Sequence, residues 1–442
     1  MVLTAVGILL HRLTRPTPSA TPDGSEQAPA TARPVSEDDV LTLMSVAGEA
    51  MIDAGFDVDR VQTDLHDIAS AHGLPEVEVL AMPTVLLVST PTGRGVRTAA
   101  VAAGQVQLRL HQIEALDDAI TQARRGLDPL EASRRIRAIK LEPAPYSRPV
   151  QLLGSVLATM GLAALLGSTW RGVLIAGALG VVTGVLVLTA QLIPSRYQAL
   201  VTVVASAAVS LTVFLLARAG LTTDVVPCLI APLVTLLPGA LLTTAVIELA
   251  TGQMIAGAGR LAAGGTQLLL LGLGIVGPAL LVGIPALELT TAAPALGAIG
   301  PWLGVAVFGV GITVNRCSRP RSLGWILIVL YVAYGAQVLG GLVVGGVLSA
   351  FVGAVVMTPV ADLVARQRTG PPAIVSFSPA FWLLVPGALG LMGVATMLSG
   401  DAAGQDTVLT TVVTMVSIAL GVLVGRALST LLQLRRDQVR PA

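Results

Sequence analysis

Polar and apolar positions divide the chain into two parts of different character. From Ser36 to Leu141, apolar residues recur singly or in pairs among charged residues, at the spacings of helices and strands. From Val150 onward, they form runs of about 20 residues, the length that crosses a bilayer as a helix. The pattern therefore predicts a small water-soluble domain followed by a polytopic, mostly α-helical membrane domain.

The soluble part is expected to be an α+β domain over residues 36–141. Ser36 precedes three acidic residues, which is typical of a helix N-terminus, and Gly55 would end that helix. A second helix is expected over 58–71, with Val61, Leu65 and Ile68 on one side. The remaining predicted elements are strands over 77–89 and 96–110 and helices near 113–124 and 129–139.

Residues 1–35 begin with a short apolar run, Val2–Leu10, followed by sequence rich in Pro, Thr and Ala. In a signal peptide the basic residues come before the apolar run, whereas here Arg12 and Arg15 follow it. We expect a disordered tail, with a membrane-surface anchor as the alternative.

The membrane part contains ten candidate spans, with five in each of two predicted repeats, residues 150–288 and 299–432, and a tail at 433–442. The candidates are 150–169, 172–193, 198–217, 224–251, 264–285, 300–315, 323–340, 342–362, 378–398 and 407–431.

Basic residues predict the orientation of these spans, because loops on the cytoplasmic side are enriched in Lys and Arg. With the N-terminal domain inside, only Arg171 and Arg218 lie outside. The arginines then on the inner side are Arg196, Arg260, Arg316, Arg319, Arg321, Arg366, Arg368, Arg426, Arg435, Arg436 and Arg440. We therefore expect both termini in the cytoplasm and the protein in the cell membrane, the inner membrane where a cell has two.

A short motif occurs twice in the membrane part. Leu236–Leu241 reads LLPGAL and Leu384–Leu389 reads LVPGAL, with the two prolines 148 positions apart. The same offset places Arg218 and Arg366 at equivalent positions. The motifs lie in the fourth and ninth spans, and because five spans is an odd number the second repeat would be inverted. Paired broken helices in inverted repeats are typical of secondary transporters; the alternative is that both Pro-Gly pairs are packing kinks.

A helix that restarts after Pro-Gly leaves backbone N–H groups free for an anionic ligand group. Thr243 and Thr244 lie about 6 to 7.5 Å beyond Gly239 along such a helix, within reach of a small ligand. The candidate substrate-binding residues are Pro238, Gly239, Ala240, Thr243, Thr244, Pro386, Gly387 and Ala388.

Ionisable groups inside spans are costly and therefore suggest coupling or gating. Glu248 and Asp362 lie inside predicted spans and are candidates, as is Arg260 near an interface; Asp362 has the alternative of pairing with Arg366 on its own helix. Thr410, Thr411, Thr414 and Ser417 would line a hydrophilic pathway, or bond to their own backbone.

Composition limits the function classes. The chain has 442 residues, of which 54% are hydrophobic and 12% charged, with a mean hydropathy of +0.81. A net charge of +1 without a basic patch argues against nucleic acid. Cys228 and Cys317, and the three histidines of the soluble part (His66, His72 and His111), lack metal-ligand spacing, and no nucleotide-binding motif is present. We expect no cofactor, no metal and no enzymatic activity.

The sequence resembles the threonine/serine exporter family. The resemblance is carried by the segments Gly48–Gly55, His72–Leu74, Met82–Thr84, Pro238–Gly239, Glu248–Leu249, Gly252, Gly257, Arg260–Leu261, Pro371, Pro379 and Leu384–Gly387. It implies a cytoplasmic N-terminal domain, ten spans, and export of L-threonine and L-serine driven by the proton motive force. The family pattern has Asp where this chain has Glu248, which places a direct substrate role for that residue in doubt.

Other functions remain open from the sequence. Some relatives are linked to dicarboxylate export, so an exporter of small dicarboxylates such as succinate is the main alternative. A channel and a membrane-anchored hydrolase are further alternatives. The expected partners are the substrate, protons and the lipid bilayer, and a homodimer is left open.

Overall fold

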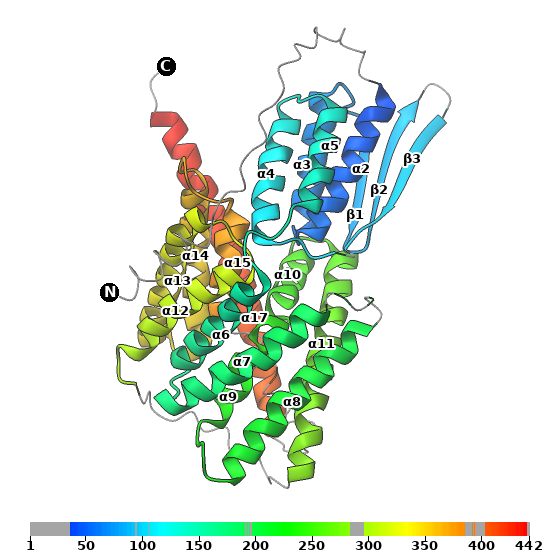
Figure 1. The fold of residues 1–442 in the computed structure, drawn as a ribbon. Coiled ribbons are helices and arrows are strands. Elements are labelled where there is room, and N and C mark those ends of the chain that lie inside the picture. The colour runs from blue at the N-terminus through cyan, green and yellow to red at the C-terminus, as the bar shows by residue number, and fades with distance from the viewer. Residues whose placement is uncertain are drawn as a thin grey trace, which may run out of the picture.

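The computed structural model describes residues 36–92, 95–104, 106–190, 192, 194, 197–282, 296–384, 391, 393 and 403–439. A unit of helices and strands lies over one end of a long helical bundle (Figure 1). The expected tail over residues 1–35 lies outside the described residues. Of the expected C-terminal tail, residues up to Val439 continue the last helix.

The N-terminal unit consists of the first seven elements. These are α2 (Glu37–Asp53), α3 (Val58–Ala71), β1 (Glu78–Met82), β2 (Val85–Thr92), β3 (Gly95–Ala102), α4 (Leu110–Arg124) and α5 (Pro129–Leu141). As predicted, Ser36 begins the first helix: its hydroxyl accepts the Asp39 N–H, and the Asp39 carboxylate accepts the Ser36 N–H in return. The second predicted helix, 58–71, is also confirmed.

The three strands form an antiparallel sheet in the order β1-β2-β3, with Leu87 opposite both Leu80 and Ala100. Two strand predictions were wrong in extent. The segment 77–89 contains two strands joined by a tight turn at Pro83–Thr84, because proline cannot donate to the ladder. The predicted strand 96–110 ends at Ala102, and Leu110 already begins α4.

The bundle contains the remaining elements. They are α6 (Arg148–Leu165), α7 (Trp170–Ala190), α8 (Gln198–Arg218), α9 (Val225–Ile230), η2 (Ala231–Leu236), α10 (Gly239–Ala250), α11 (Met254–Val282), α12 (Gly300–Asn315), η3 (Pro320–Ser322), α13 (Leu323–Val344), α14 (Gly346–Ala365), α15 (Ala373–Leu383) and α17 (Ala403–Val439).

Among the described residues, seven helices are long and apolar enough to cross a membrane. The bent pair Val225–Leu236 and Gly239–Ala250 provides an eighth span, and α12 and α15 are shorter apolar helices of 16 and 11 residues. The protein is thus a multi-span, mostly helical membrane protein, while the count of ten crossings stays a prediction. The fifth span, expected over 264–285, begins ten residues earlier at Met254, so α11 includes Arg260.

The bundle is centred on a close contact between α6 and α12. A Cβ on Gly161 would lie 2.2 Å from the backbone N of Phe308, and one on Gly311 would lie 2.1 Å from the backbone N of Ala158. At the far end, a Cβ on Gly154 would lie 2.7 Å from the backbone N of Asn315. The partner position falls along α12 as the position rises along α6, so the two helices are antiparallel. Glycine is required at these positions because the two backbones touch.

Candidate functional site

The fourth apolar segment is interrupted at its Pro-Gly motif. The 3₁₀ turn η2 ends at Leu236, Leu237 is extended, and α10 begins at Gly239 after a bend of 63°. Pro238 is the residue before this helix and makes no side-chain cap. The sequence prediction of a broken helix here is therefore confirmed.

The break exposes backbone groups at the ends of the two half-helices. On the η2 side, the Leu236 carbonyl accepts a hydrogen bond from Gln267 Nε2 on α11, at 2.6 Å. On the α10 side, the first N–H groups have no acceptors within their own helix, and the N-cap residue Pro238 provides no side-chain cap. Gln267 was missed from the sequence, although a glutamine in the middle of an apolar span was a visible signal.

Thr243 stands out among the polar residues of α10. Its side chain is fully buried, and its Oγ1 has no hydrogen-bond partner among the described residues. A helical threonine commonly satisfies this hydroxyl with the carbonyl four residues earlier, and leaving it unpaired in a buried site costs free energy. The hydroxyl therefore belongs to a place where a polar ligand group would be stabilised.

The other predicted substrate residues divide by position. Pro238 and Gly239 are buried at the break, and Ala240 and Thr244 are half-buried beside it. Pro386, Gly387 and Ala388 lie outside the described residues. Helix α15, which leads into that second motif, contacts α10.

Glu248 lies in the last turn of α10, close to the N-terminal unit. Its side chain is 1% exposed; Oε2 lies 3.1 Å from Arg260 Nε of α11, and Oε1 accepts the Val58 N–H at 3.3 Å. Arg260 Nη2 in turn donates to the Phe56 carbonyl at 3.1 Å. The carboxylate thus lies at the N-terminus of α3, where the helix dipole favours a negative charge.

The Glu248–Arg260 contact is an ion pair without a well-directed hydrogen bond, because neither Oε2 nor Nε finds a hydrogen-bond partner. The sequence placed Glu248 on the same broken span as the substrate residues. The structure places it at the junction between that span and the N-terminal unit.

A second contact holds the same end of α3. Asp57 caps α3 by accepting the Arg60 N–H, and its carboxylate also pairs with Arg426 of α17 at 2.8 Å. Burial by itself would raise the pKa of the Asp57 carboxyl, but the Arg426 guanidinium and the Arg60 N–H outweigh burial and hold this pKa below its usual value. The start of α3 is therefore bonded to α10, α11 and α17 together.

The N-terminal unit meets the bundle again at the loop between α12 and α13. The backbone N–H groups of Leu110 and His111 donate to the carbonyls of Arg316 and Cys317. Glu114 of α4, which is 2% exposed, accepts hydrogen bonds from the hydroxyls of Ser318 and Ser322. Burial raises the pKa of Glu114, although these hydroxyls and the Arg319 guanidinium act in the opposite direction.

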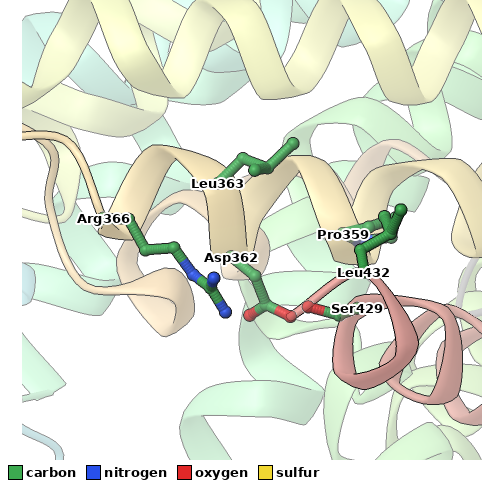
Figure 2. A pocket seen from close by; sticks show the side chains of 6 residues that line it. All are labelled: Pro359, Asp362, Leu363, Arg366, Ser429 and Leu432. Atoms are coloured by element: carbon green, nitrogen blue, oxygen red, sulfur yellow. The ribbon is translucent and has the colours of Figure 1, made fainter. Parts of the chain in front are cut away.

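The remaining candidates lie elsewhere. Asp362 and Arg366 point toward each other beside a pocket between α14 and α17, without an ion pair within 4.0 Å (Figure 2). On α17, Thr411, Thr414 and Ser417 are buried and Thr410 is half-buried. The Thr414 hydroxyl donates to the Thr410 carbonyl, so at this position the backbone-bonding alternative is correct.

Two histidines of the N-terminal unit, His72 and His111, lie beside backbone carbonyls. His72 lies within hydrogen-bonding distance of the Ile68 and Leu127 carbonyls, and His111 Nδ1 lies 3.0 Å from the Cys317 carbonyl. Among the described residues, no group of His, Cys, Asp or Glu is arranged to hold a metal ion.

A multi-span bundle with a helix broken at buried, unpaired polar groups defines the class of membrane transport proteins. The chain matches the family described as "Putative threonine/serine exporter" over residues 42–281, more than half of its length, and it belongs to that family. The match covers the N-terminal unit and the bundle through α11. No curated protein and no solved structure matches the chain.

Proposed function

We propose that this protein exports L-threonine and L-serine from the cytoplasm through a site at the break before α10. The observation that carries the proposal is the buried Thr243 hydroxyl, which has no hydrogen-bond partner among the described residues. It lies in the second turn of a helix whose N-cap residue, Pro238, offers no side-chain hydrogen bond to the first N–H groups. The N–H groups suit the substrate carboxylate. The Thr243 hydroxyl suits the hydroxyl or ammonium of the same small molecule.

Gln267 extends this site. Its amide nitrogen is held by the Leu236 carbonyl, which leaves the amide oxygen as an acceptor beside the break. The Gln267 amide oxygen can accept a hydrogen bond, the Thr243 hydroxyl can donate or accept one, and the first N–H groups of α10 can donate. Together these groups match a small zwitterion that carries a hydroxyl. A dicarboxylate such as succinate would need positive charge for its second carboxylate, and the described residues that we assign to this site include no Lys or Arg.

The two halves of the bundle are proposed to be inverted repeats. The antiparallel contact of α6 with α12, the first helix of each half, supports this arrangement. The third and last helices of each half also pack as equivalent pairs, α8 with α11 and α14 with α17. In this arrangement the second Pro-Gly motif supplies the other side of the site.

The N-terminal unit is proposed to lie in the cytoplasm and to cover the inner end of the pathway. Glu248 and Arg260 act as the gating pair, because they tie α10 and α11 to the first turn of α3. Release of this contact would free the end of the broken helix. Coupling to the proton motive force is part of the proposal and rests on the family.

The test is efflux of labelled L-threonine from loaded vesicles containing the purified protein, with and without an imposed pH gradient. We expect gradient-dependent efflux that is lost in Gly239→Leu, because a side chain at the first residue of α10 fills the backbone site. Gly324→Leu is the matched control: Gly324 is exposed at the start of α13, and apart from its chain neighbours and its own helix backbone nothing lies within 4 Å of a Cβ there. Efflux of succinate but not of threonine would show that the substrate is a dicarboxylate and contradict the proposed one. Equal efflux by both variants would show that the break before α10 is not the binding site.

A further inference from the structure

The geometry points to a second binding site, the pocket between α14 and α17, for a small zwitterion that carries an ammonium group and an anionic oxygen group. The pocket is lined by Pro359, Asp362, Leu363 and Arg366 of α14 and by Ser429 and Leu432 of α17 (Figure 2). It shares no residue with the break before α10, so the inference does not depend on the proposed transport site.

Within the described part of the chain, the polar groups around this pocket have no hydrogen-bond or ion-pair partner. Asp362 and Arg366 are four residues apart on one helix, a spacing at which opposite charges readily pair. They point toward each other across the pocket, yet no ion pair closes within 4.0 Å (Figure 2). Ser429 is 7% exposed and makes no hydrogen bond within the part of the chain that the structure describes. An acid, a base and a hydroxyl are thus left open around one cavity.

The size of the cavity limits the ligand. Its volume is about 70 Å³. One water needs roughly 10–15 Å³ of such space, so the cavity accommodates about five to seven non-hydrogen atoms, the size of serine. Pro359, Leu363 and Leu432 supply apolar walls for the carbon atoms of such a ligand.

The charges determine how the ligand would lie. Its ammonium would bind the Asp362 carboxylate, and its carboxylate or phosphate would accept hydrogen bonds from the Arg366 guanidinium. The Ser429 hydroxyl is available to a third polar atom. Two sources carry this chemistry: a free amino acid such as L-serine, and the headgroup of phosphatidylethanolamine, whose acyl chains would extend past the exposed Leu363 and Leu432.

The test uses cysteine labelling of the full-length protein. Cys228 and Cys317 are 0% and 1% exposed, whereas position 429 lines the pocket, so Ser429→Cys introduces a thiol that a small thiosulfonate reagent reaches selectively through the pocket. The rate of labelling, followed by mass spectrometry, is measured with and without L-serine in detergent, and in phosphatidylcholine nanodiscs with and without phosphatidylethanolamine. Thr430→Cys is the matched control, since Thr430 is the exposed neighbour of Ser429 on the same helix.

We expect L-serine or phosphatidylethanolamine to slow labelling at position 429 about tenfold when present at ten times its dissociation constant, with no effect at position 430. Protection should disappear when Asp362→Asn or Arg366→Gln is added. It should persist with Asp362→Glu or Arg366→Lys, which keep the charges, and with Arg368→Gln, which removes a neighbouring exposed one. Protection by L-serine identifies an amino-acid site, and protection by the lipid alone identifies a headgroup site. The inference is overturned if neither probe slows labelling, or if protection survives loss of both charges.

Discussion

The Glu248 carboxylate at the end of α10 accepts the backbone N–H of Val58, 190 positions earlier in the chain, in the first turn of α3. This contact joins the half-helix that begins at the Pro-Gly break to the N-terminal unit. Arg260 completes it by pairing with Glu248 and donating to the Phe56 carbonyl. Movement of α10 and movement of the N-terminal unit are therefore mechanically linked.

The gating role predicts that Glu248→Gln loosens the N-terminal unit. Removing one member of a buried ion pair leaves the other charge unpaired, at a cost of about 3 kcal/mol or more. Hydrogen exchange at the start of α3 should therefore accelerate, while exchange in the sheet stays unchanged. The double variant with Arg260→Gln should recover part of the loss, because no unpaired charge remains; equal exchange in all three proteins would contradict the linkage.

Thr243→Val separates a ligand role from a packing role. The substitution keeps the shape and removes a buried hydroxyl that has no hydrogen-bond partner in the part of the chain that the structure describes, so the thermal stability should stay the same or rise. Transport of L-threonine should fall about tenfold or more, because a hydrogen bond to the substrate is lost. Efflux assays and thermal unfolding on the same preparation measure both effects, with Thr244→Val as the comparison. Unchanged efflux in Thr243→Val would show that the Thr243 hydroxyl does not bind the substrate.

Glu114 predicts a pH dependence in the contact between α4 and the α12–α13 loop. Burial raises the folded-state pKa of this acid above the ordinary value of 4.5 for a glutamate side chain. The folded protein then binds the proton more tightly than the unfolded chain, so the contribution of Glu114 to stability is largest below pH 4.5 and declines as pH rises through the folded-state pKa. Melting temperature as a function of pH measures this effect. In Glu114→Gln that part of the pH dependence should vanish. A melting temperature that varies with pH in the same way in the variant and the original protein would contradict the role given to Glu114.

The α6–α12 contact predicts a strong effect from a single methyl group. In Gly311→Ala the new Cβ would lie 2.1 Å from the backbone N of Ala158, and backbone atoms cannot move aside as a side chain does. We expect the protein to lose about 1 to 3 kcal/mol of unfolding free energy or more. Gly259→Ala, at an exposed position of α11 with open space around it, should unfold like the original protein. Denaturation in detergent compares the two, and equal midpoints would mean that the helices separate easily.

Local sequence was sufficient to determine several features of this protein. The helix start at Ser36, the helix over 58–71 and the break at Pro238 were all predicted, because capping, apolar periodicity and the missing proline N–H act within a few residues. The long apolar segments likewise indicated a multi-span bundle. Proline also explains one failure: Pro83 separates two strands within an apolar segment that alone resembles one strand.

Tertiary structure decided what these elements do together. Arg260 lies within α11 although its charge suggested a loop, because Glu248 and the Phe56 carbonyl stabilise the guanidinium there. Gln267 belongs to the candidate site because it donates to the Leu236 carbonyl, which is exposed by the break at Pro238. Hydrophobic patterning determines that a segment is buried in lipid or protein, but the partner of a buried polar group is chosen by residues far away in the chain, through packing that no local pattern records.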